Sequence, residues 1–335
     1  MSISDSILIH ADAGAFEGWG HLRESLEVAR TLRNLGRHCV LVLPEGVSAA
    51  QEEARASGFE VIAIPVSDWQ ENQSPEQIIR ALKSDPRAAL VSDLLKITPA
   101  YGNAIIESHH RWATITELRE DELAPINFNI SKSPEYVPLS DPYRQASAHV
   151  IQDSIRQVLV CFGGSDPSNV TGKALEWIRA AIEKGRLPGV SRIVVVLGPL
   201  FADHESICAA AATYPAEIDL RRSLSPIELA HVASESDLAV TTSGGTMYEF
   251  CALGVPCIVV PVLPKHILNA RVLKDRQAVL LTRQFHHVTA EEITMSIDHL
   301  SAGPIRARMS QAAQREIDGM GASRIADRLV KEWGI

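Results

Sequence analysis

The sequence predicts an α/β protein built from two doubly wound parallel sheets. Short apolar runs, typical of buried strands, alternate with amphipathic helical patterns along the whole chain. The 335 residues are about twice the length of a typical domain, which favours two such units. A stretch rich in Pro and Ser, Ser131–Ala148, has no sustained period and separates the halves. We therefore expect domains at residues 1–148 and 149–335, with the last helix packing back across the junction.

The composition argues against several classes of protein. A net charge of −9 disfavours a nucleic-acid surface and a polybasic membrane patch. No apolar run reaches the roughly 18 residues that a membrane span needs, and the N-terminus lacks the basic start of a signal peptide. The five cysteines stand in no metal-ligand spacing, as in reduced proteins. We expect a soluble, cytoplasmic protein with no metal site, no cofactor, no nucleic-acid partner and no stable membrane insertion.

The first half alternates strands with helices. The first apolar run, Ile3–His10, is followed by an amphipathic helix from Leu22 that Gly36 closes. Further strands are expected at residues 39–43, 59–64, 88–93, 112–118 and 126–130, with helices at 51–57, 75–83 and 99–109. Alternation at this pitch indicates a doubly wound parallel sheet.

The motif Gly18-Trp-Gly-His-Leu-Arg23 opens the first helix. Gly18 and Gly20 permit a tight loop over a ligand, and His21 then lies in the first helical turn. There the helix dipole disfavours an imidazolium, so we expect His21 to be neutral near pH 7, as a general base must be. The alternative is that His21 only caps the helix. Arg23 could reach a phosphate or pair with Glu27 one turn further on.

Asp93 is a second candidate in this half. It ends the buried run AALVSD, at the carboxyl edge of a parallel sheet, where α/β proteins bind their ligands. Its side chain could orient a water or hold a sugar hydroxyl, and capping of the next turn is the alternative.

The second half opens with an apolar strand at residues 157–162 and then a glycine turn. Gly163, Gly164 and Ser165 lie between this strand and a helix at residues 170–182, so their backbone and hydroxyl groups could contact phosphate. The alternative is a plain turn. A strand at 192–197 and a helix at 226–234 follow, and helices at 290–300, 305–318 and 322–333 end the chain.

A second glycine turn follows the apolar run Leu238–Val240. It contains Ser243, Gly244, Gly245 and Thr246, and it leads into a helix at residues 246–253 and a strand at 257–261. Unpaired amides and the helix dipole both favour an anion there. Glu249, one turn into the helix, could accept hydrogen bonds from a ribose diol, and together these features indicate a nucleotide-diphosphate site. The alternative is an ordinary turn with a solvated Glu249.

His266 and Asn269 complete the candidate binding residues. They lie one turn apart at the start of the next helix, so both side chains could reach the same ligand. Contact with sugar or phosphate and capping at the surface are equally compatible with the sequence.

The motifs together resemble one branch of the nucleotide-sugar enzymes with the GT-B fold. The segments that carry the resemblance span nearly the whole chain and read GWGHLR, CFGGSDPSN, TSGGTMYEFCALGVP, HILNA and DGMGASRIADRL. That branch contains the UDP-sugar hydrolase of pseudaminic acid biosynthesis and related spore-coat polysaccharide glycosyltransferases. More distantly, it includes the N-acetylglucosaminyltransferase that makes lipid II.

The resemblance implies two Rossmann-like domains facing a cleft, with UDP on the C-terminal one. It also implies that His21 activates water against the anomeric carbon, that Gly244, Gly245 and Thr246 hold pyrophosphate, and that Glu249 binds ribose. The sequence departs from the family on the sugar side. Leucines follow Asp93 where a tyrosine is usual, His266 replaces a common glutamine, and Trp19 is bulky between its glycines.

The sequence therefore predicts a hydrolase that releases UDP from an activated amino or deoxy sugar in surface-glycan or nonulosonic acid biosynthesis, with His21 as base. A GT-B glycosyltransferase with the same donor site is the first alternative, because the acceptor differs and the donor does not. A non-catalytic nucleotide-sugar-binding protein is the second. A dehydrogenase is disfavoured because the first strand–helix loop lacks G-x-G-x-x-G. The sugar and the oligomeric state stay open.

Overall fold

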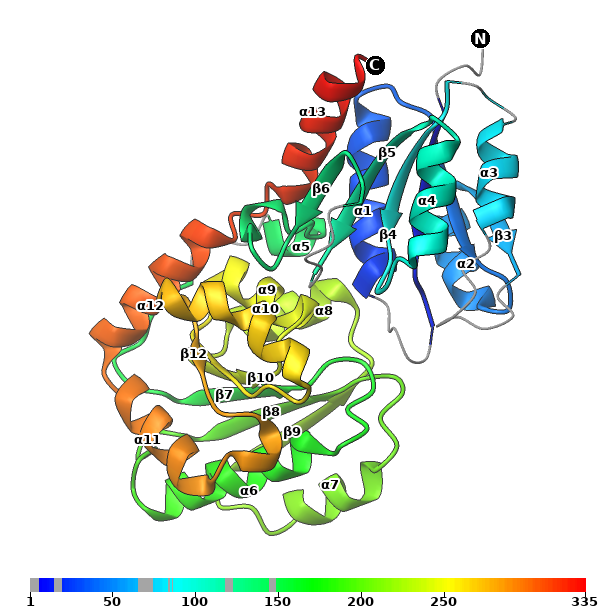
Figure 1. Cartoon of the computed structure of the whole chain (residues 1–335). Helices are drawn as coiled ribbons and strands as arrows, with labels where there is room; N and C mark the ends of the chain where they lie inside the picture. The colour runs from blue at the N-terminus through cyan, green and yellow to red at the C-terminus, as the bar shows by residue number, and fades with distance from the viewer. Residues whose placement is uncertain are drawn as a thin grey trace. The chain divides into compact units, whose positions relative to one another are not determined.

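The chain folds as two compact α/β units, Met1–Leu139 with Met320–Ile335, and Ser140–Gly319. The computed structural model describes residues 6–14, 20–65, 75–83, 85, 87–117, 123–144 and 149–335. In Figure 1 each unit contains a sheet flanked by helices. The expected division at residue 148 falls close to the boundary between these units.

The first unit contains a six-stranded parallel sheet in the order β3-β2-β1-β4-β5-β6. Its strands are β1 (Ile7–Ala11), β2 (Cys39–Pro44), β3 (Glu60–Ile64), β4 (Ala89–Asp93), β5 (Arg111–Thr116) and β6 (Ile126–Asn129). The strand order reverses between β1 and β4, which pair in parallel from Ile7 opposite Ala89 to Ala11 opposite Asp93. Doubly wound sheets bind ligands at the carboxyl ends of the strands at such a reversal.

Helices cover this sheet. They are α1 (Gly20–Asn34), α2 (Ser48–Ala56), α3 (Pro75–Lys83), α4 (Pro99–Glu107), the short 3-10 helix η1 (Pro134–Tyr136) and α13 (Gly321–Trp333). The last of them, α13, packs against α1 and η1. Gly321 permits this approach, since a Cβ there would lie 2.1 Å from the carbonyl oxygen of Val137. The last helix, expected to pack back across the junction, thus lies with the first unit.

The second unit repeats the topology, with the strand order β12-β11-β10-β7-β8-β9. Its strands are β7 (Gln157–Cys161), β8 (Arg192–Leu197), β9 (Glu217–Arg222), β10 (Leu238–Thr241), β11 (Cys257–Val259) and β12 (Leu280–Leu281). Its helices are α5 (Asp141–Arg144), α6 (Val170–Glu183), α7 (His204–Ala211), α8 (Pro226–Ser234), α9 (Gly245–Leu253), α10 (Pro264–Asp275), η2 (Phe285–His287), α11 (Ala290–Leu300) and α12 (Gly303–Glu316). The reversal here falls between β7 and β10.

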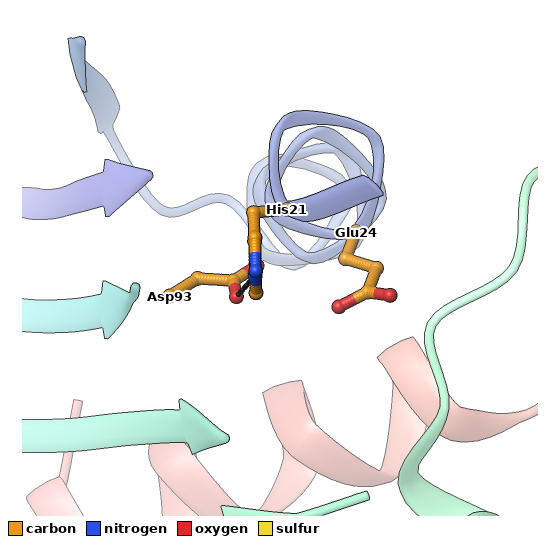
Figure 2. Close-up of side chains that lie close together, drawn as sticks. All are labelled: His21, Glu24 and Asp93. Atoms are coloured by element: carbon orange, nitrogen blue, oxygen red, sulfur yellow. Dashed lines mark hydrogen bonds and ion pairs between the residues drawn. The ribbon is translucent and has the colours of Figure 1, made fainter. Parts of the chain in front are cut away.

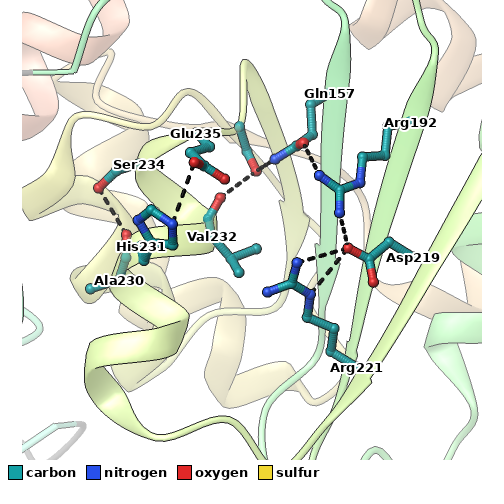
Figure 3. A network of polar contacts seen from close by, with 10 residues as sticks. Gln157, Arg192, Asp219, Arg221, Ala230, His231, Val232, Ser234 and Glu235 are labelled. Atoms are coloured by element: carbon teal, nitrogen blue, oxygen red, sulfur yellow. Dashed lines mark hydrogen bonds and ion pairs between the residues drawn. The ribbon is translucent and has the colours of Figure 1, made fainter.

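The sequence did not predict β9, because this edge strand lacks a continuous apolar run. Its sequence, EIDLRR, is only partly buried. Asp219 on β9 accepts hydrogen bonds from Arg221 at 2.9 Å and from Arg192 on the neighbouring β8 (Figure 3). These pairs hold the charged edge against the sheet.

Both sheets have apolar cores on their helix-covered faces. The strands β1, β2, β4, β7 and β10 are almost wholly buried. Among the described helices, none combines the length and the apolar character needed to cross a membrane.

Candidate functional site

His21 and Asp93 meet at the strand-order reversal of the first sheet. Asp93 is the last residue of β4, and His21 is the second residue of α1, the helix that follows the neighbouring strand β1. The two side chains are buried, and the imidazole Nδ1 lies 2.7 Å from Asp93 Oδ1 (Figure 2). A carboxylate only accepts hydrogen bonds, so Nδ1 carries the proton. Nε2 is therefore the ring nitrogen at which a further proton can be taken up.

The second oxygen of Asp93 is also held. Ser25, one turn beyond His21 on α1, donates its hydroxyl to Asp93 Oδ2 at 2.9 Å. The described contacts of the Asp93 carboxylate are thus with α1, and none of them caps the next turn, which was the alternative interpretation of this residue.

The pKa of His21 corrects the expectation of a neutral imidazole. Burial by itself lowers this pKa, but the charge and hydrogen bond of Asp93 outweigh it, and Glu24 and Glu117 add to the effect, raising the pKa from 6.5 to about 10. A carboxylate at 2.7 Å in a buried site has a much stronger effect than a helix terminus. His21 of the ligand-free protein is therefore an imidazolium near pH 7.

Glu24 brings a third ionisable side chain to this place. Donor atoms of His21, Glu24 and Asp93 lie within 4.8 Å of one another, and all three residues are buried. Such donors suit a transition metal. However, two ligands of one ion, each about 2.1 Å from it, are about 3 Å or more apart. The 2.7 Å between His21 and Asp93 is the spacing of a shared proton.

The rest of the first motif contributes less. Gly18 lies outside the described residues. Gly20 begins α1 in an exposed position, with no atom within 4 Å of the place of a Cβ. Arg23 is exposed, and the ion pair described for Glu27 is with Arg30.

The two glycine turns of the second unit lie at the strand-order reversal of its sheet. The turn with Gly163 and Gly164 follows β7, and the turn with Gly244 and Gly245 follows β10. These strands are parallel neighbours, with Cys161 opposite Thr241. Both turns therefore lie at one edge of the sheet, as expected.

The backbone of both turns is open to a ligand. Gly163 and Gly244 have φ angles of 82° and 142°, which favour glycine. Gly164 and Gly245 have ordinary φ angles, and a Cβ at either would meet no atom within 4 Å. Neither the backbone conformation nor packing requires glycine at these two positions. Because Gly244 is the N-cap of α9, no side chain of that residue covers the first N–H groups of the helix.

The first turn is held by the segment that follows β8. The carbonyl oxygen of Gly164 accepts a hydrogen bond from the backbone N–H of Leu200 at 3.0 Å. Gly198 lies directly against this turn, since a Cβ there would be 2.2 Å from the same oxygen. The half-buried Ser165 precedes Asp166, whose carboxylate caps α6 by accepting from the N–H groups of Val170 and Thr171.

His266 ties α10 to the second glycine turn. Its Nδ1 accepts hydrogen bonds from the backbone N–H groups of Val262 and Leu263, both at 3.3 Å, so the neutral ring carries its proton on Nε2. Ser243 donates its hydroxyl to the carbonyl oxygen of His266 at 2.7 Å. The structure therefore gives His266 a capping contact, while Asn269 is buried one turn further along α10.

Glu249 lies on α9, half-buried, near the end of β7. Burial raises the pKa of the Cys161 thiol, and the charges of Glu249 and Asp166 raise it further, against a hydrogen bond with the backbone of Gly163. Glu249 is thus close enough to the end of β7 for its charge to act on Cys161. Thr246, in the first turn of α9, is also half-buried.

Two residues of the first site were missed by the sequence interpretation. Glu24 and Ser25 stand three and four positions after His21, so a helix places all three on one face. That spacing was the available signal.

Comparisons with known proteins identify relatives of low identity. No family model matches the chain. It is 22% identical over 347 residues to the spore coat polysaccharide biosynthesis protein SpsG of Bacillus subtilis, covering 95% of each chain. It is 24% identical over 282 residues to an uncharacterized protein of Methanocaldococcus jannaschii, covering 76% of this chain and 55% of that protein.

A third relative is named as a transferase. The chain is 30% identical over 186 residues to the UDP-N-acetylglucosamine–N-acetylmuramyl-(pentapeptide) pyrophosphoryl-undecaprenol N-acetylglucosamine transferase of a Bradyrhizobium strain. The match covers 53% of this chain and 48% of the transferase. The chain thus spans only about half the length of this relative and of the archaeal one.

Solved structures share the fold over almost the whole chain. MurG of Acinetobacter baumannii superposes with a TM-score of 0.66 at 16% identity, covering 98% of this chain and 99% of that one. A putative UDP-N-acetylglucosamine 2-epimerase of Listeria monocytogenes gives 0.66 at 14%, covering 99% and 97%. These likenesses and the two sheets confirm the GT-B fold.

Proposed function

We propose that this protein is an inverting GT-B glycosyltransferase whose donor substrate is a UDP-sugar. Three lines support the proposal. The chain is similar over nearly its full length to a polysaccharide biosynthesis protein and over half of it to a transferase named for UDP-N-acetylglucosamine. The described residues place an imidazole–carboxylate pair at one strand-order reversal and two open glycine turns at the other.

The second unit binds the donor nucleotide in this proposal. The N–H groups around Gly245 and Thr246 at the start of α9, with those of Gly163 and Gly164, receive the pyrophosphate, because backbone donors and the helix dipole favour an anion. Glu249 accepts hydrogen bonds from the ribose. The sequence also predicts contacts between the sugar nucleotide and four further residues, namely Ser165, Ser243, His266 and Asn269.

The first unit supplies the base, and the hydrogen bond between His21 and Asp93 is the observation that carries this step. Because Nδ1 donates to Asp93, Nε2 of a deprotonated His21 takes the proton of the acceptor hydroxyl. The hydroxyl oxygen then bonds to the anomeric carbon as the bond from that carbon to the diphosphate oxygen breaks. The departing charge goes to the diphosphate, where preorganised N–H donors can stabilise it by several kcal/mol.

The comparisons favour transfer over the hydrolysis expected from the sequence. None of the proteins named above is described as a hydrolase, whereas one is a transferase. The same His21 would act on water in a hydrolase, so the acceptor is the only difference. Binding without catalysis is disfavoured, because the buried imidazole–carboxylate pair has the geometry of a general base and its orienting partner.

The test measures UDP release from a panel of UDP-sugars, with and without hydroxyl-bearing acceptors. The acceptors are a short oligosaccharide and a polyprenyl-linked sugar, and mass spectrometry follows the sugar. A transferase releases UDP only with an acceptor and leaves the sugar on it. Fast release of UDP and free sugar without acceptor would establish the hydrolase instead. Tight UDP binding with no release from any pair would overturn both.

A further inference from the structure

The carboxylate of Asp93 is hydrogen-bonded to two side chains from the same helix, α1. His21 and Ser25 are four residues apart on α1, so they lie above one another on one helix face. His21 Nδ1 lies 2.7 Å from Oδ1, and Ser25 Oγ lies 2.9 Å from Oδ2. Ser25 is fully buried and Asp93 is 1% exposed.

The directions of these two hydrogen bonds follow from the chemistry of the carboxylate. Both oxygens of an ionised Asp93 accept, so Ser25 must donate its only proton to Oδ2 and His21 must donate from Nδ1. A carboxylate held at one oxygen can rotate about its Cβ–Cγ bond, whereas one held at both oxygens cannot. Ser25 therefore fixes the plane in which Oδ1 meets the imidazole.

The hydroxyl of Ser25 also changes how the negative charge is distributed over the Asp93 carboxylate. A donor to Oδ2 draws part of the negative charge of the carboxylate away from Oδ1. Without it, Oδ2 is a buried oxygen that has lost its donor, and more negative charge faces His21. The other charged groups that face His21 are Glu24 on α1 and Glu117, which follows β5.

We propose that Ser25 is a positioning residue of the site, which orients His21 and moderates its basicity through Asp93. Its catalytic consequence rests on the proposed function, and its effect on the imidazole does not. Ser25 does not touch the reacting atoms. It sets the ring orientation and the tautomer of His21, the residue that contacts those atoms in the proposed reaction.

The test compares Ser25→Ala with Ser25→Cys, which keeps a weak donor of similar size. Thr31→Ala is the matched control, because Thr31 lies on the same helix and its hydroxyl donates to a backbone carbonyl, that of Glu27. The first readout is the pKa of His21 from NMR titration of its ring nitrogens in the ligand-free protein. The second is the pH profile of kcat/KM, with kcat and KM separated.

We expect Ser25→Ala to raise the pKa of His21 and to move the rising limb of kcat/KM to higher pH. We also expect kcat to fall about tenfold with little change in the KM of the donor, because the proposed nucleotide contacts are on the second unit. Ser25→Cys should lie between Ser25→Ala and the wild type, and Thr31→Ala should leave the pKa and the profile unchanged.

Two results overturn the inference. One is a Ser25→Ala protein that is less stable but keeps the wild-type His21 pKa, which would make Ser25 a packing residue. The other is an equal shift in Thr31→Ala, which would make the effect a general one of helix α1. If Ser25→Ala shifts the pKa while the wild type turns over no UDP-sugar, the inference stands and the proposed function fails.

Discussion

The two units reverse their strand order in the same way, yet they build different sites at the reversal. In the first unit the site consists of buried side chains, namely His21, Asp93 and Ser25. In the second unit it consists of exposed or half-buried backbone, the turns around Gly164 and Gly245.

In the proposed function, this difference separates proton transfer in the first unit from nucleotide binding in the second. A buried carboxylate beside an imidazole shifts a pKa strongly, because little water screens the pair. Backbone N–H groups offer hydrogen bonds to an anion but do not titrate. Changes in the first site should therefore act on rate and pH dependence, and changes in the second on affinity for the nucleotide.

The largest effect is expected for His21→Ala. Loss of the base should lower kcat by about 10²- to 10⁴-fold, while calorimetry should give an unchanged Kd for UDP. His231→Ala is the control, since His231 is an exposed histidine on α8 paired with Glu235 (Figure 3). Full turnover in His21→Ala would show that the first site does not supply the base.

The pH dependence gives the second prediction. Since kcat/KM reports groups of the free enzyme and the pKa of His21 is about 10, kcat/KM of the wild type should rise about tenfold per pH unit from pH 7 towards 10. In Asp93→Asn, only the charges of Glu24 and Glu117 still oppose the effect of burial, so the pKa of His21 should fall and the rising limb of the profile should move to lower pH. The plateau of the variant should be about a hundredfold below that of the wild type, because the asparagine amide can fix the wrong tautomer. A flat wild-type profile would contradict the role of His21 as base.

Gly245→Ala should act on binding alone. The added methyl enters the open space before the turn, so the Kd for UDP should rise tenfold or more, about 1.4 kcal/mol. Stability should be unchanged or slightly higher, because the φ of Gly245 suits alanine. Gly303→Ala is the matched control, since Gly303 also begins a helix and its Cβ would have only ordinary contacts, the nearest at 3.5 Å. Equal UDP affinity in wild type and Gly245→Ala would place the nucleotide elsewhere.

The smallest effect is expected for Glu249→Gln. Loss of charged acceptors for the ribose hydroxyls should weaken UDP binding by about three- to tenfold. The affinity for 2′,3′-dideoxy-UDP should not change, because that ligand lacks the hydroxyls. Equal losses for both nucleotides would refute the ribose contact.

The sequence predicted most elements of both sheets, because buried strands such as β4 and β7 are continuous apolar runs. It missed the charged edge strand β9, in which alternation replaces such a run. His21 and Asp93 were each identified, but not their contact, since they are 72 residues apart and only the pairing of β1 with β4 brings them together. The expected neutral imidazole was wrong for the same reason. A local argument from the helix dipole could not include a carboxylate from another strand.

The contacts that hold the first glycine turn, from Leu200 and Gly198, affect the entropy of ligand binding. The peptide that joins Gly164 to Ser165 is planar and trans, so with its oxygen fixed on the N–H of Leu200 its own N–H points the opposite way. Gly198 fills the space behind that oxygen, which leaves the turn little freedom to reorient. In the proposed complex, this turn therefore loses little conformational freedom when the pyrophosphate binds.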